Sequence, residues 1–185
     1  AQEDMNILVG ADFDTYFDNR EYSGSEIGES GTLFSSRLTP KVGVEWNEKN
    51  RLVFGMDMWS HFGDDTRVFA KARPQIYYRF DSGKVRAYAG IFSREEMIGD
   101  YSEAFISDSV RFYENRVQGF MGQYRGDRGF VELSLDWCGM YSQASREKFR
   151  VLSGGRYYFD NYHRRFYGGY ALQVFHYAGS ETIEN

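Results

Sequence analysis

The chain has 185 residues, a formal net charge of -5 and 18% aromatic residues. This length is typical of one domain with a sizeable core, so we expect residues 1–185 to form a single domain. No apolar run approaches the roughly eighteen residues of a transmembrane helix, which excludes helical spanning. Basic residues are scattered along the chain, so a nucleic-acid partner is not supported.

Two features bear on the cellular compartment. The chain begins Ala1-Gln-Glu-Asp with neither a charged nor an apolar leader segment, and we interpret it as a mature exported protein that has lost a signal peptide. The single Cys138 cannot form an internal disulfide. We expect Cys138 to be a small buried side chain on a strand.

Nine stretches alternate between apolar and polar residues with a period of two, which predicts β-strands. In chain order they are residues 6–17, 34–46, 52–62, 68–80, 85–94, 111–124, 131–137, 149–159 and 165–178. The second is the clearest, because Phe34, Leu38 and Val42 share one face. Arg37 and Lys41 share the other face. About ten such residues suffice to cross a bilayer as a tilted barrel strand.

The connections between these strands alternate in length. Four short turns fall on one side of the predicted sheet, at residues 47–50, 81–84, 125–129 and 160–163. Two long connections, residues 18–31 and 95–109, fall on the other side. Short periplasmic turns and long extracellular loops are typical of outer-membrane barrels, and aromatic residues near both strand ends suit two interfacial belts. The pattern predicts an all-β, antiparallel up-and-down transmembrane β-barrel with about 8–10 strands in this chain.

Two details conflict with the simplest barrel. Single-chain bacterial barrels have an even number of strands, so either residues 111–124 are not a strand or the chain is the N-terminal part of a larger barrel. We favour the larger barrel. Pro40 and Pro74 lie inside strands, where each removes a hydrogen-bond donor. We predict a β-bulge or an unpaired position at each proline.

Alternation alone does not reveal which face points outward. A soluble lipocalin-like barrel buries its apolar face and binds an apolar ligand inside, with the same period. A membrane barrel exposes the apolar face to lipid. The long strands, the alternating loop lengths and the aromatic residues at strand ends favour the membrane barrel.

Residues 94–102 (REEMIGDYS) and 132–137 (ELSLDW) stand out as signature segments. With the strand pattern of the whole chain, they resemble porin-type outer-membrane proteins of Gram-negative bacteria. The resemblance implies a β-barrel in the bacterial outer membrane, with the lipid bilayer and small polar solutes as partners. A homo-oligomer or partner outer-membrane subunits are also compatible with it. No cofactor and no substrate follow from the resemblance.

Charged residues on the polar faces are predicted to line the lumen of a porin that passes small polar solutes without chemistry. They are Asp12, Asp14, Arg37, Lys41, Asp57, Lys71, Arg73, Arg79, Arg86, Arg94, Arg116, Glu132, Asp136, Arg150 and Arg156. The cations of residues 68–94 have no acid on the same polar faces, whereas the first strand is acidic, which would create a transverse field. The alternative is a narrow lumen filled by ion pairs, in a barrel whose extracellular loops act in adhesion or assembly.

Candidate catalytic residues are few. His61 shares a polar face with Asp57, which is compatible with an acid–histidine pair, but no serine in a distinctive motif accompanies it. We therefore predict a histidine at the barrel rim and no enzymatic activity. His163 lies in a turn and His176 near a strand end. The carboxylates of Glu95, Glu96 and Asp100 could bind a divalent cation, but a solvated acidic loop is the default, and we predict no metal site.

Overall fold

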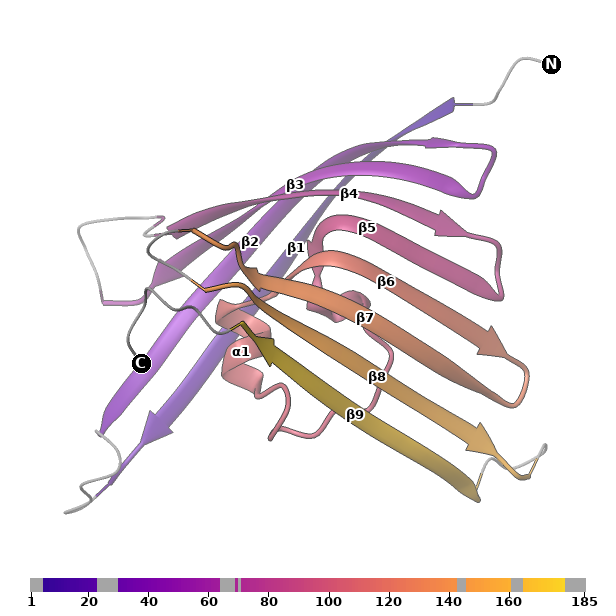
Figure 1. The fold of residues 1–185 in the computed structure, drawn as a ribbon. Coiled ribbons are helices and arrows are strands. Elements are labelled where there is room, and N and C mark those ends of the chain that lie inside the picture. Colours follow the sequence, from indigo (N-terminus) through magenta and orange to yellow (C-terminus); the bar gives the residue numbers. More distant parts are fainter. Residues whose placement is uncertain are drawn as a thin grey trace.

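The computed structural model describes residues 5–22, 30–63, 69, 71–142, 146–160 and 165–178. These residues form one antiparallel sheet of nine strands that pair in sequence order (Figure 1). The strands are β1 (Met5–Arg20), β2 (Gly31–Trp46), β3 (Asn50–His61), β4 (Lys71–Asp81), β5 (Val85–Ser93), β6 (Arg116–Gly126), β7 (Gly129–Gly139), β8 (Lys148–Tyr158) and β9 (Tyr167–Tyr177). A 3-10 helix, η1 (Arg94–Glu96), and one helical turn and a half, α1 (Asp108–Tyr113), lie between β5 and β6. In the described residues, no helix is long and apolar enough to span a bilayer.

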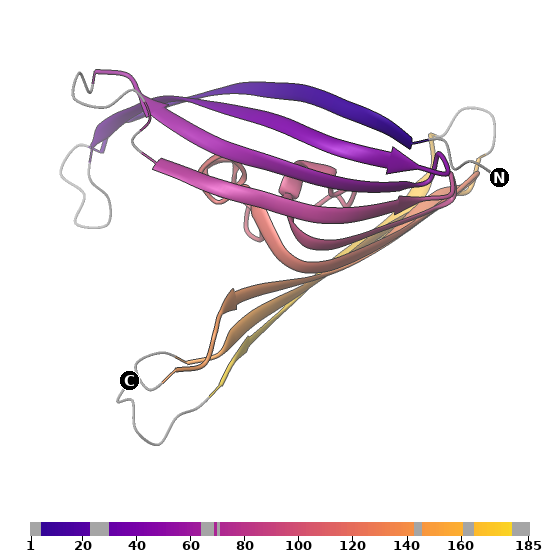
Figure 2. The same cartoon turned by 90° about the horizontal axis from the view of Figure 1, so that it is seen from above.

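The predicted all-β, up-and-down topology is confirmed. Each strand pairs antiparallel with the next, and the connections β2–β3, β4–β5 and β6–β7 lie together at one end (Figure 1). The sheet curves around a concave face, within which the β5–β6 connection folds (Figure 2). Among the described strand pairs, β1 and β9 are edges that do not pair with each other. The expected larger barrel stays a prediction.

The two faces of the sheet differ in chemistry. The outward face carries exposed apolar side chains, such as Val9 (83% exposed), Phe13 and Leu172. The concave face carries polar side chains that are almost completely buried, such as Thr39 and Gln75. An outward apolar face opposite a polar interior is the arrangement of barrels surrounded by lipid.

The sixth predicted strand begins too early. Residues 108–113 form α1, and β6 starts only at Arg116. The Ser107 side chain caps the helix by accepting a hydrogen bond from the Val110 backbone N–H at 3.3 Å, and Asp108 follows in the first turn. A serine N-cap and an early acidic residue both stabilise a helix start, and here they override the weak alternation.

The proline prediction is confirmed in its second form, an unpaired position. Pro40 faces Ala11 of β1, but the pairing of β2 with β3 skips from Leu38 to Lys41. Pro74 faces Met56 of β3, and pairing between β4 and β5 begins only at Ile76. A missing N–H removes one ladder bond and leaves the register intact.

The prediction for Cys138 is confirmed for its place on a strand, β7, and is wrong for its burial, because the thiol is exposed. It lies beside the one register shift among the described strand pairs, between Trp137 and Gly139 on β7. A bulge at a strand end turns its side chains away from regular packing.

The β5–β6 connection, residues 94–115, is called the plug from here on. Its Ile106 side chain is 1% exposed and packs in a cluster with Phe92 and Leu152, both completely buried. The main apolar core therefore lies between the plug and the concave face of β3, β4, β5, β6 and β8.

Candidate active site at the rim of the sheet

Two buried carboxylates of β7 hold the plug. Glu132 accepts hydrogen bonds from the backbone N–H of Ile98 at 2.7 Å and from the Tyr101 hydroxyl at 2.9 Å. Asp136 accepts from Arg94 at 2.5 Å and from Arg150 at 3.2 Å. Both signature segments of the sequence thus contact each other, one from the plug and one from the sheet. Buried carboxylates with several donors are satisfied structural anchors.

The predicted lumen residues lie on the concave face or in the plug, and most of them form ion pairs. The pairs are Arg37 with Asp14 and Glu95, Lys41 with Asp12, Lys71 and Arg73 with Glu114, Arg79 and Arg86 with Asp81, Arg94 and Arg150 with Asp136, and Arg156 with Asp100. The cations of β4 and β5 therefore do face acids, supplied by Asp81 at the end of β4 and by Glu114 of the plug. Alternation within a strand could not reveal these partners. The pore-lining role of the residues stays an untested prediction.

Asp57 and Arg116 complete the predicted set. Asp57 is completely buried and accepts hydrogen bonds from Thr39 at 2.7 Å and Gln75 at 2.9 Å. Arg116 donates to the Pro74 carbonyl at 3.2 Å. Asp57 is therefore not the partner of His61, so the acid–histidine pair that was the alternative to a rim histidine does not form.

His61 instead faces a serine across the sheet. The register of β2 and β3 places Ser35 directly opposite His61, and Ser35 Oγ lies 2.7 Å from His61 Nδ1. Ser35 Oγ also lies 2.9 Å from the Tyr113 hydroxyl of α1. Ser35 is 1% exposed, whereas His61 is exposed at the end of the sheet away from the hairpin turns. A polar triplet thus runs from a buried hydroxyl to an accessible imidazole.

A signal for Ser35 was present in the sequence. The turn at residues 47–49 pairs Trp46 with Asn50. Ser35 lies as many residues before Trp46 as His61 lies after Asn50, so the same register pairs them. A tight turn fixes the register of a hairpin, so counting back from it identifies the partner of His61.

The C-terminal end of α1 is held by two residues of the sheet, which positions Tyr113. The Phe112 carbonyl accepts hydrogen bonds from Trp59 Nε1 at 3.0 Å and from Arg37 Nη1 at 3.1 Å. The Phe112 ring stacks on Tyr16 with centroids 5.3 Å apart. The last carbonyls of a helix have no partner within it, so these donors stabilise the end of α1.

Basic side chains surround the residue that follows α1. Lys71 and Arg73 lie over the Trp59 ring at 5.5 and 6.0 Å from its centroid, and Arg73 donates to Glu114 at 2.9 Å. Burial raises the pKa of Glu114, but the hydrogen bond and charge of Arg73 outweigh it, with help from Lys71 and Arg116, and hold the pKa below its ordinary value. Glu114 thus lies close to three cations, of which Lys71 and Arg73 form ion pairs with it.

Glu95, Glu96 and Asp100 of the plug each contact a basic or hydroxyl group of another element. Glu95 pairs with Arg37 and Asp100 with Arg156, and Glu96 accepts a hydrogen bond from the Tyr88 hydroxyl at 2.5 Å. No group of three metal-ligating side chains occurs in the part of the chain that the structure describes. His163 lies outside the described residues, and His176 stacks on Phe149 at 4.5 Å.

Aromatic rings cover the outward face at the level of the Ser35–His61 pair. Phe34 and Phe62 lie next to Ser35 and His61 in the chain, and their ring centroids are 4.2 Å apart. Phe17 adds an edge contact to Phe34 at 5.6 Å. All three rings are at least 45% exposed. Exposed aromatic clusters of this kind are typical of the membrane–water interface.

The fold is an all-β, up-and-down sheet of the kind found in outer-membrane barrels, and its rim carries a serine–histidine pair. A family model described as lipid A 3'-O-deacylase-type matches residues 2–185, and the chain belongs to that family. The family is one of outer-membrane enzymes. The comparison with curated proteins gave no match.

This family overturns the porin interpretation, the expected passage of polar solutes and the expected absence of enzymatic activity. It equally overturns the adhesion and lipocalin-like alternatives. The physical reason for the error is that apolar–polar alternation reports lipid outside and polar groups inside. The alternation along each strand is the same whether the concave face lines a channel or packs against a plug.

Proposed function

We propose that the protein hydrolyses an ester-linked acyl chain of lipid A, or of a closely similar anionic glycolipid, in the outer leaflet of the outer membrane. The observation that carries the proposal is the contact between Ser35 Oγ and His61 Nδ1 at 2.7 Å. The family assignment supports the substrate class. The aromatic cluster of Phe17, Phe34 and Phe62 supports the location, because it sets the pair at the depth where acyl esters meet the headgroup.

The burial of Ser35 determines its role in the proposed reaction. A serine that is 1% exposed does not reach a substrate, so we assign it to positioning. When His61 Nδ1–H donates to Ser35 Oγ, the Ser35 hydroxyl donates to Tyr113, and His61 Nε2 keeps a free lone pair. Hydrogen bonding at one ring nitrogen thus prepares the other as a base.

The reaction follows general base catalysis. His61 Nε2 takes a proton from a water molecule as its oxygen attacks the ester carbonyl. The tetrahedral intermediate then releases the sugar oxygen, which receives the proton from His61. The products are a fatty acid and a free sugar hydroxyl. The cations Lys71, Arg73 and Arg116 support binding of an anionic headgroup beside the pair.

The test uses the full chain in detergent micelles with purified lipid A, and mass spectrometry to measure loss of one acyl chain. His61→Gln is expected to lower the rate about 10²–10⁴-fold, the usual contribution of a general base. The matched control is His176→Gln, another exposed histidine near the same end of the sheet, which is expected to keep the wild-type rate. Wild-type activity in His61→Gln, or an acyl group found covalently on Ser35, would overturn this assignment.

A further inference from the structure

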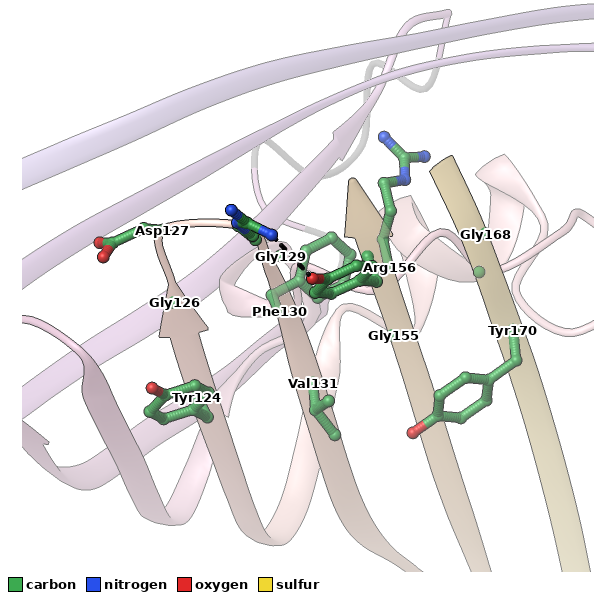
Figure 3. Close-up of a pocket in the computed structure, with 13 residues that line it drawn as sticks. Tyr124, Gly126, Asp127, Gly129, Phe130, Val131, Gly155, Arg156, Gly168 and Tyr170 are labelled. Carbon is green, nitrogen blue, oxygen red and sulfur yellow. Dashed lines mark hydrogen bonds between the residues drawn. The ribbon is translucent and has the colours of Figure 1, made fainter. Parts of the chain in front are cut away.

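The outward face of β6–β9 contains a groove near the hairpin-turn end, with a cavity volume of about 640 Å³ (Figure 3). The register aligns Val131, Gly155 and Tyr170 in one row across β7, β8 and β9. Val131 and Tyr170 are 48% and 45% exposed, so the row faces outward. The groove therefore lies at the opposite end of the strands from the Ser35–His61 pair and on the other face of the sheet.

Glycines create the groove. In the first row, Val131 and Tyr170 lie on either side of Gly155. In the next row toward the turns, Gly129 and Gly168 lie on either side of Tyr157. A Cβ added at Gly155 would lie 2.7 Å from the Tyr170 ring, because this ring packs over Gly155. The absence of side chains at Gly129 and Gly168 leaves a slot between Tyr124 and Val131 on one side and Tyr157 and Tyr170 on the other. Its volume lies within the range of about 300–1,000 Å³ for small-molecule sites.

One end of the slot carries an uncompensated cation. Arg128, in the β6–β7 turn, donates to the Tyr157 hydroxyl at 3.3 Å. Its neighbour Asp127 pairs with Lys84 at 3.8 Å. Among the described residues, no carboxylate forms an ion pair with Arg128. An apolar slot that ends at a guanidinium and a hydroxyl is complementary to a lipid with an anionic head and an acyl tail.

We infer that this groove binds one glycerophospholipid of the periplasmic leaflet, with its phosphate on Arg128 and an acyl chain along the slot beside Val131. The short turns of outer-membrane barrels face the periplasm, which places Arg128 at the headgroup level of that leaflet. The site is separate from the proposed acyl hydrolysis and does not depend on it.

The experiment uses the purified full chain in detergent, with phosphatidylglycerol as the probe and native mass spectrometry as the readout. The expected result is one retained lipid per chain. Arg128→Gln removes the charge, and Val131→Trp fills the slot; each is expected to lower retention at least about tenfold. Lys84→Gln and Leu133→Trp are the matched controls, because they change a turn cation and the next outward position of β7 outside the groove.

Two outcomes would overturn the inference. One is equal retention by the wild type, Arg128→Gln and Val131→Trp. The other is preferential retention of lipid A over phosphatidylglycerol, which would assign the groove to the opposite leaflet. Heat-modifiable gel mobility of every variant shows that a lower retention does not come from a failure to fold.

Discussion

The two polar clusters beneath the plug differ in how they meet solvent, and this difference separates stability from chemistry. Glu132 and Asp136 are at most 2% exposed, and each accepts hydrogen bonds from several donors. In the rim cluster, Ser35 is equally buried, but its partner His61 is exposed. A satisfied buried carboxylate holds a structure together, whereas an imidazole with one nitrogen held and one accessible can move a proton. Polar residues on one face of a sheet therefore have different roles.

The largest expected effect on stability comes from Asp136→Ala. The substitution leaves the guanidinium groups of Arg94 and Arg150 without their shared carboxylate in a buried place. Breaking a buried ion pair by removing one partner costs about 3–5 kcal/mol. Denaturant unfolding in micelles, followed by tryptophan fluorescence, measures the loss. His61→Gln should leave the unfolding midpoint unchanged; equal destabilisation by both variants would remove the proposed distinction between the clusters.

An intermediate effect is expected for Ser35→Ala, and it concerns activity. Loss of the hydroxyl frees the His61 ring from its hydrogen bond, and we expect the rate of acyl release to fall about tenfold, equivalent to about 1.4 kcal/mol. Ser35→Thr keeps a hydroxyl and should recover part of the rate. The split between kcat and KM distinguishes positioning from a packing defect, because the loss in Ser35→Ala should fall on kcat while KM and the unfolding midpoint stay unchanged. A loss confined to KM, or no recovery of kcat in Ser35→Thr, would argue against the positioning role.

A smaller effect is expected for Tyr113→Phe. This change removes the second hydrogen bond to Ser35 Oγ but keeps the ring that packs against Phe112 at 4.9 Å. A neutral hydrogen bond contributes about 0.5–1.5 kcal/mol, so the rate should fall less than in His61→Gln while the fold is retained. Acyl release by mass spectrometry and the unfolding midpoint measure the two quantities. A loss of activity as large as that of His61→Gln would show that Tyr113 takes part in the chemistry.

The smallest effect concerns the acid stability of the plug. The pKa of Glu114 is held below its ordinary value, so its ion pairs contribute stability above the unfolded-state pKa and lose it as the pH falls through the folded pKa. The half-exposed side chain makes this contribution modest. Glu114→Gln should lower the unfolding midpoint slightly at neutral pH and match the wild type below the folded pKa. A difference that persists in acid would point to packing instead of charge.

The sequence determined the strands, their faces and the pairing of the hairpins. Backbone geometry places alternate side chains on opposite faces, so Phe34, Leu38 and Val42 had to share one surface whatever surrounded them. Tight turns set the registers, and the opposition of Ser35 and His61 follows from one of them. Local chemistry also explains the interruptions at Pro40 and Pro74.

Only the tertiary structure decided the path of the plug. Residues 95–109 have no regular period, and α1 has six residues, far fewer than the 12–15 or so that an isolated helix needs in water. The position of the plug depends on Glu132 and Asp136, while Arg37 and Trp59 hold the end of α1. These partners come from distant strands. The contact of Tyr113 with Ser35 therefore arises only when the curved sheet brings them together, because side-chain partners across a concave face leave no local pattern in the chain.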